Sequence, residues 1–193
     1  MPDILHITVL FISLPTASNP SPSFCRSALL IIISFFGGGA KSLNNLKSAA
    51  SDIFYNGING DGLGIQRELN HRVEYAFNLL TVAGRYIPDD DAVRQTAAAR
   101  DALINSAGVA EKSENNLRLT EAVTALYARL GQEKLSDQDA RYRENLYTEI
   151  KARNNIISND GYNKEARAFN QKLDVFPASV IKAFKLATEL PQF

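Results

Sequence analysis

The chain has 193 residues, and its 21 Lys plus Arg residues balance its 21 Asp plus Glu residues. This length can bury the core of one domain without metal or disulfide crosslinks, and a net charge of zero supplies no electric field that would attract nucleic acid. Cys25 is the single cysteine, which excludes an intrachain disulfide framework and a multi-cysteine zinc site.

The N-terminal residues 1–39 differ in composition from the rest of the chain. An apolar run, 4–14, precedes a segment with three prolines, 15–23, and a second apolar run, 28–36, ends in three glycines. Neither run reaches the roughly 18–20 apolar residues of a membrane-spanning helix, and no basic segment precedes the first run as in a signal peptide. The pattern predicts a hydrophobic leader that is either a short membrane anchor or a disordered extension.

From Ala40 onward the apolar residues recur at helical spacing, and no segment alternates as a strand does. A first helix is predicted over 41–55 and ends at the glycine-rich loop "NGINGDG". The most sustained amphipathic pattern covers 63–87, includes Leu69, Val73 and Ala76 on its apolar face, and stops at Pro88. These segments indicate two long helices joined by a glycine-rich connection.

The next predicted helix begins with three carboxylates, Asp89–Asp91, where the helix dipole favours negative charge. Its predicted inner face includes Leu103 and Ile104. We expect a kink near Gly108, after which this face continues through Leu119, Val123, Leu126 and Leu130 up to the end of the helix at Gly131. Ser136 and Asp139 resemble a capping box, which predicts the start of the last long helical segment. Four amphipathic segments with short connections favour an all-α, up-and-down four-helix bundle over residues 40–193, behind the hydrophobic leader.

The closing segment, "YNKEARAFNQKLDVFP" (162–177), repeats an aromatic–Asn pair after seven residues. Its apolar residues are separated by 4, 3, 4 and 3 positions and share one helical face: Tyr162, Ala166, Phe169, Leu173 and Phe176. This face is predicted to pack against other helices.

The closing segment resembles the last helix of LemA family proteins, in which such aromatic–Asn pairs lead to a Phe-Pro stop. The segment 66–87 is similar to a second signature of that family, through Arg72, Glu74, Asn78 and Leu79. It departs from the signature at His71, where Arg is common, and at Phe77, where Pro is common. The resemblance covers roughly residues 40–185. It implies a helical domain attached to a membrane by a helix at the position of residues 24–39, and it implies no particular catalytic activity.

Several patterns that could carry chemistry are incomplete. Glu68 and His71 have the spacing of a di-iron ligand pair, but His6 in the leader is the only other histidine. The loop 57–68 half fits a calcium-binding loop, although Gly57 replaces the first Asp ligand. Cys25 lies in the leader with no histidine partner in view, and without a second histidine in the domain the serines form no catalytic triad. We therefore predict no catalytic residue, no metal ligand and no cofactor.

Three asparagines, Asn78, Asn163 and Asn170, lie beside apolar residues on predicted helices, although Asn forms helices poorly. One interpretation is that they form hydrogen bonds between helices and fix the packing register. The other is that they line a polar groove for a peptide or a partner helix. These residues are the candidate register-setting or partner-binding site.

The composition, the incomplete motifs and the resemblance together favour a non-enzymatic interaction or scaffold protein at the cell membrane. Membrane attachment is expected through the leader, with a protein partner that the sequence does not identify and without nucleic acid. The alternative is a soluble cytoplasmic bundle that binds a small ligand or a metal ion, with or without catalysis. Elemental analysis of the purified protein distinguishes a metal-binding bundle from the first interpretation.

Overall fold

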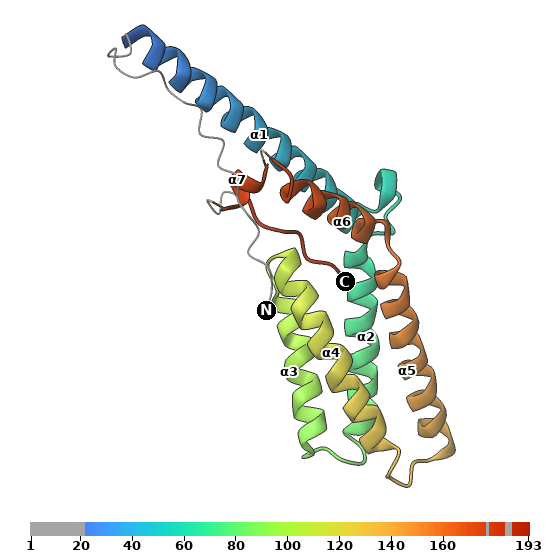
Figure 1. Cartoon of the computed structure of the whole chain (residues 1–193). Coiled ribbons are helices and arrows are strands. Elements are labelled where there is room, and N and C mark those ends of the chain that lie inside the picture. Colours follow the sequence, from blue (N-terminus) through green and yellow to red (C-terminus); the bar gives the residue numbers. More distant parts are fainter. Residues whose placement is uncertain (1–21, 177, 184–186) are drawn as a thin grey trace, which may run out of the picture. The chain divides into compact units, whose positions relative to one another are not determined.

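The computed structural model describes residues 22–176, 178–183 and 187–193 (Figure 1). All regular elements in this part of the chain are helical, so the prediction of an all-α fold is confirmed. The elements are α1 (Pro22–Asn56), a 3₁₀ turn η1 (Ile58–Gly60), α2 (Ile65–Ala83), α3 (Asp91–Asn105), α4 (Val109–Leu130), α5 (Asp137–Ser158), α6 (Gly161–Leu173) and α7 (Ala178–Ala183).

The bundle consists of α2, α3, α4 and α5, with successive helices running in opposite directions (Figure 1). Helix α2 packs against α3 and α5, and α4 packs against the same two helices. The up-and-down bundle is therefore confirmed, but the predicted kink near Gly108 is wrong. Helix α3 ends at Asn105, and the extended backbone of Gly108 (φ −122°, ψ 163°) precedes α4. The chain thus reverses its direction here, and one predicted segment supplies two of the four helices.

The buried residues follow the predicted apolar faces with a few exceptions. Those of α4 that were predicted to form its inner face are all buried: Leu119, Val123, Leu126 and Leu130. Ile104 and Tyr142 are exposed instead. Phe176 is also exposed, because α6 ends at Leu173 and the helical spacing does not continue beyond that residue.

The helix termini agree with the predicted capping residues. The Asp90 carboxylate accepts a hydrogen bond from the N–H of Ala92 at 2.9 Å and caps α3. Ser136 caps α5 by accepting from the N–H of Asp139 at 3.1 Å. Helix α2 ends at Ala83, before the predicted stop at Pro88, and the intervening residues form a turn. Local capping interactions therefore set the start of α3 and α5.

The chain divides into two units, residues 1–37 and 38–193, and the second contains the bundle. Residues 1–21 of the predicted leader lie outside the described residues. Helical backbone covers the three glycines that were expected to end the second apolar run. Among the described residues, no helix is both long enough and apolar enough to cross a membrane.

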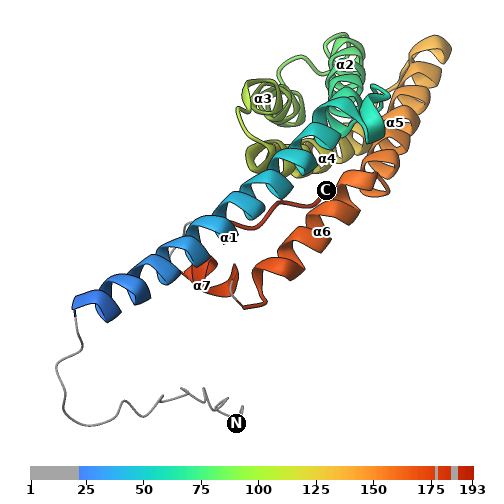
Figure 2. The same ribbon diagram turned by 90° about the horizontal axis from the view of Figure 1, so that it is seen from above.

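Within the second unit, the end of α1 lies close to α6 and to the C-terminal residues of the chain. Figure 2 shows the C-terminal segment running between these two helices. Phe54 of α1 is fully buried, and its ring centroid lies 5.4 Å from that of Tyr162 in α6. The sequence-predicted asparagines of α6 lie next to this contact.

Candidate functional site

Asn163 is buried in the first turn of α6, with 1% of its surface exposed. Its Nδ2 atom donates to the carbonyl oxygens of Ile157 at 2.8 Å and Ser158 at 3.3 Å, at the end of α5. Its Oδ1 atom accepts from the N–H of Phe193 at 2.8 Å. One amide side chain therefore connects α5, α6 and the last residue of the chain.

Asn170 lies two helical turns further along α6 and is half-buried. Its Nδ2 atom donates to the carbonyl oxygen of Leu190, and its Oδ1 atom accepts from the N–H of the same residue, both at 2.8 Å. The Tyr162 hydroxyl donates to the carbonyl oxygen of Pro191 at 3.0 Å. We call Leu190–Phe193 the tail, and the surface formed by Phe54, Tyr162, Asn163 and Asn170 the tail groove.

The aromatic part of the tail groove holds the side chain of Phe193. The Phe193 ring centroid lies 5.5 Å from that of Phe54 and 6.1 Å from that of Tyr162. Such rings bury large apolar areas and add favourable edge contacts. Burial raises the pKa of Tyr162 to about 12, so its hydroxyl stays protonated and remains a donor at neutral pH.

The structure separates the three predicted asparagines. The side chains of Asn163 and Asn170 both form hydrogen bonds with main-chain atoms of the tail, whereas Asn78 is exposed on α2. The sequence indicated the two asparagines of α6 because they follow buried aromatics. It did not indicate their partners, since the tail carries no helical pattern.

A second polar cluster lies inside the bundle around Arg72, whose side chain is completely buried. The Arg72 Nη1 atom donates to Oδ1 of Asn116 and, at 2.6 Å, to Oδ1 of Asn154. Its Nη2 atom donates to Oγ1 of Thr120 at 2.7 Å. The guanidinium therefore joins α2 to both α4 and α5.

All the hydrogen-bond acceptors of Arg72 are neutral. Within the described residues, no carboxylate forms an ion pair with Arg72, and its Nε atom has no hydrogen-bond partner. Burial lowers the pKa of Arg72 to about 10, so the guanidinium is still charged at neutral pH. An unneutralised charge in the interior of a bundle is costly and therefore requires an explanation.

The sequence contained a signal for this buried cation that its interpretation missed. Arg72 follows Leu69 by three positions and precedes Ala76 by four, so it lies on the buried face of α2. The interpretation placed the half-exposed Val73 on that face instead. A charged residue at an apolar position of an amphipathic helix is the pattern that indicates a buried ionic cluster.

The model of the LemA family matches residues 63–193, about two thirds of the chain. The chain belongs to the LemA family. The match begins in the loop before α2 and includes the whole bundle, α6 and the tail. No curated protein and no solved structure matches this chain.

In this LemA chain, the residues of the incomplete di-iron and calcium patterns have other partners in the structure. Glu68 is buried and accepts from Nη1 of Arg153 at 3.2 Å, while His71 lies 4.0 Å from Glu74. The Asp61 carboxylate in the glycine-rich loop accepts from the N–H of Leu63 at 2.9 Å. Three or more metal-ligating side chains do not gather anywhere in the part of the chain that is described.

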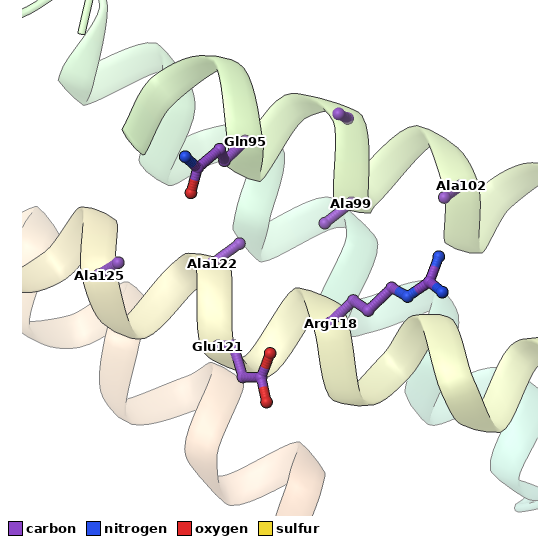
Figure 3. A pocket seen from close by; sticks show the side chains of 8 residues that line it. Gln95, Ala99, Ala102, Arg118, Glu121, Ala122 and Ala125 are labelled. Carbon is purple, nitrogen blue, oxygen red and sulfur yellow. The ribbon is translucent and has the colours of Figure 1, made fainter. Parts of the chain in front are cut away.

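A groove of about 640 Å³ lies between α3 and α4 of the LemA bundle (Figure 3). Methyl groups form most of its wall, with Gln95 on α3 and Arg118 and Glu121 on α4 as its polar side chains. Arg118 is paired with Glu114 on its own helix. Small side chains explain the space between the two helices.

Proposed function

We propose that this LemA family chain is a non-enzymatic, membrane-associated interaction protein whose tail groove binds a peptide segment of a protein partner. The observation that carries the proposal is the pair of hydrogen bonds between Asn170 and the main chain of Leu190. An amide side chain that satisfies both polar groups of one residue recognises a peptide backbone in general, because every residue except proline carries the same two groups.

The other polar contacts of the tail groove have the same character. Tyr162 donates to a main-chain carbonyl of the tail, and Asn163 accepts from a main-chain N–H. Side-chain recognition comes from the aromatic contact of Phe193 with Phe54 and Tyr162, from the burial of Leu190, and from a 3.5 Å hydrogen bond that Nη1 of Arg167 donates to Oε1 of Gln192. The partner segment that fits is therefore non-helical and carries an aromatic side chain three residues after its contact with Asn170.

The chain's own tail would compete with such a partner. A segment tethered within the same molecule has a high effective concentration, of the order of mM for a short flexible link. A partner segment then binds when its own contacts are better or when the tail is drawn away. The tail groove would in this way be protected until a partner is present.

The membrane part of the proposal is supported by the apolar run "ALLIIISFF" (28–36). Apolar helices that are too short to cross a bilayer can lie in its interface, where they bury one face among the acyl chains. Attachment through this segment would present the bundle and its tail groove close to the membrane surface.

The test uses a chain that ends at Ala187 and a fluorescent peptide with the sequence of residues 188–193, TELPQF. We expect saturable binding measured by fluorescence anisotropy, and binding at least about tenfold weaker to the full chain, because its own tail competes. Asn170→Ala in the shortened chain should weaken binding, whereas Gln171→Ala, an exposed neighbour on the same helix, should not.

Replacing the phenylalanine of the peptide by alanine should also weaken binding, since the aromatic contact is lost. Circular dichroism of the shortened chain provides the control for folding. A folded shortened chain that does not bind the peptide at about 1 mM contradicts the proposal, as does a shortened chain that no longer folds. In the second case the tail is simply part of the folded domain.

The alternative function, a bundle that binds a small ligand, is favoured by a different observation. This is the unneutralised guanidinium of Arg72 next to a cavity.

A further inference from the structure

A cavity of about 230 Å³ lies between α2, α4 and α5, directly beside the Arg72 cluster. This volume is well above the roughly 15 Å³ that one water molecule requires. Its wall includes the side chains of Arg72, Thr120, Thr124, Lys151, Asn154 and Asn155. The wall also includes the apolar side chains of Val123 and Ile150, so polar groups face the cavity from all three helices within a partly apolar lining, and its volume is large enough for a small ligand.

The charges that line this cavity have one sign. Arg72 and Lys151 are its two cations, and no Asp or Glu belongs to its wall. The structure pairs neither cation with a carboxylate among the described residues. Two unpaired positive charges beside one cavity attract an anion, and the attraction to the buried charge is weakly screened by salt.

Lys151 is held at this cavity by an aromatic pair. Its Nζ atom lies 4.5 Å from the ring centroid of Tyr147, which stacks on Tyr127 with 3.9 Å between the ring centroids. The cation–π contact orients the ammonium group and leaves its hydrogen atoms available to acceptors. The ammonium group is thus placed to contact a ligand in the cavity.

The hydrogen-bond inventory of Arg72 also leaves capacity for an anion. A guanidinium has five N–H donors, and three hydrogen bonds connect it to Asn116, Thr120 and Asn154. The N–H of Nε is one of the two donors that remain. The amide oxygen of Asn154 faces the guanidinium, and its Nδ2 atom forms no hydrogen bond with the described residues.

We propose that the cavity between α2, α4 and α5 binds a small oxyanion of the phosphate class, neutralised by Arg72 and Lys151. The anion supplies the negative charge that the protein does not place beside the buried guanidinium of Arg72, and its oxygen atoms accept from the ammonium group of Lys151 and from Nδ2 of Asn154. This site is separate from the tail groove, and the inference does not depend on the proposed peptide binding.

The test measures the melting midpoint of the full chain in increasing concentrations of inorganic phosphate, with ionic strength kept constant by chloride. Because the anion binds the folded state, we expect a midpoint that rises with the logarithm of phosphate concentration above the dissociation constant. Isothermal titration calorimetry should give the same constant. A second series with glycerol 3-phosphate shows whether the ligand is the free anion or a phosphate monoester, and binding in either series supports the inference.

Lys151→Gln removes one cation and should weaken phosphate binding about threefold to fivefold, as expected for an exposed charge. Lys164→Gln removes an exposed lysine of α6 and should leave the affinity unchanged. Arg72→Gln should abolish phosphate binding if the variant chain folds. If this variant does not fold, the comparison of Lys151→Gln with Lys164→Gln decides whether the cavity binds phosphate. Equal midpoints in phosphate and chloride, or equal affinities of the parent and Lys151→Gln, overturn the inference.

Discussion

Asn170 and Leu190, twenty positions apart, exchange two hydrogen bonds of 2.8 Å, one in each direction. The side chain of one residue thereby satisfies both main-chain polar groups of the other. Asn163 repeats part of this arrangement two helical turns earlier, by accepting from the N–H of Phe193. The aromatic–Asn repeat of α6 thus places its aromatics in the core and two asparagines along the tail.

Asn163→Ala should destabilise the folded chain. The substitution leaves the part-buried N–H of Phe193 without its acceptor and removes one donor from the carbonyl oxygen of Ile157, which still accepts from the N–H of Asp160. This loss costs about 1–3 kcal/mol. Urea denaturation monitored by circular dichroism measures this difference. Asn78→Ala is the matched control, because Asn78 is exposed and alanine's better helix propensity should leave stability unchanged or raise it by a few tenths of a kcal/mol. Equal effects of the two substitutions would contradict the assigned role of Asn163.

Asn170→Ala should act on the tail more than on the bundle. Asn170 is half-buried, and both of its hydrogen bonds go to Leu190. Loss of these bonds should accelerate amide hydrogen exchange at Leu190 while amides in α2 and α5 keep their protection. Exchange read by NMR or mass spectrometry measures the effect, and Gln171→Ala serves as control. Unchanged exchange at Leu190 would show that the tail is held by other contacts.

The sequence predicted the features that depend on short-range spacing. The buried face of α4 from Leu119 to Leu130 and the capping box at Ser136 follow from residues three or four positions apart, and both are present in the structure. The LemA resemblance rested on two such segments and is confirmed. Amphipathic period and local capping are sufficient for these features, because the helix itself defines the geometry.

The features that the sequence did not predict depend on contacts between distant segments. Arg72 binds residues 44, 48 and 82 positions away, and charged residues are normally assigned to the surface. The reversal before Gly108 was interpreted as a kink because the apolar spacing resumes after it. The partners of Asn163 and Asn170 lie in a tail without periodicity. In each case the decisive contact is tertiary.

Asp139 should make the stability of the bundle depend on pH in the acidic range. A hydrogen bond from the Tyr86 hydroxyl, together with Ser136 and the nearby Arg85 guanidinium, holds the pKa of Asp139 below its ordinary value. Because the pKa is lower in the folded state, the ionised carboxylate stabilises the folded chain. This stabilisation is fully present above the unfolded-state pKa of about 3.9 and is lost as the pH falls through the folded-state pKa.

Asp139→Asn should therefore lower the melting midpoint at neutral pH, and the difference from the parent should narrow as the pH falls below about 4. Thermal denaturation across this pH range gives the comparison. Asp137→Asn, an exposed carboxylate in the same first turn of α5, should change the midpoint much less. A difference that is constant from neutral to acidic pH would show that the charge of Asp139 does not contribute.

The domain should fold without metal. Its helices bury apolar faces that include Leu69, Leu119 and Ile157, and such a core does not require a metal ion to form. A chelator should leave the helical circular dichroism and the melting midpoint unchanged, and added calcium should not shift the midpoint. A rise of several degrees with calcium or iron would instead support the loop 57–68 or the Glu68–His71 pair as a binding site.

Removal of the leader should release the chain from membranes. The apolar runs 4–14 and 28–36 are the segments with the composition to enter a lipid bilayer. Fractionation of cells should place the full chain in the membrane fraction and a chain that starts at Ala40 in the soluble fraction. A full-length variant with Ile32→Asp should shift toward the soluble fraction, since a carboxylate in the second run opposes burial among acyl chains. Circular dichroism of the shortened chain verifies that it is folded. If the full and shortened chains distribute equally, the leader is not an anchor, and the peptide and anion sites belong to a protein that acts away from the membrane.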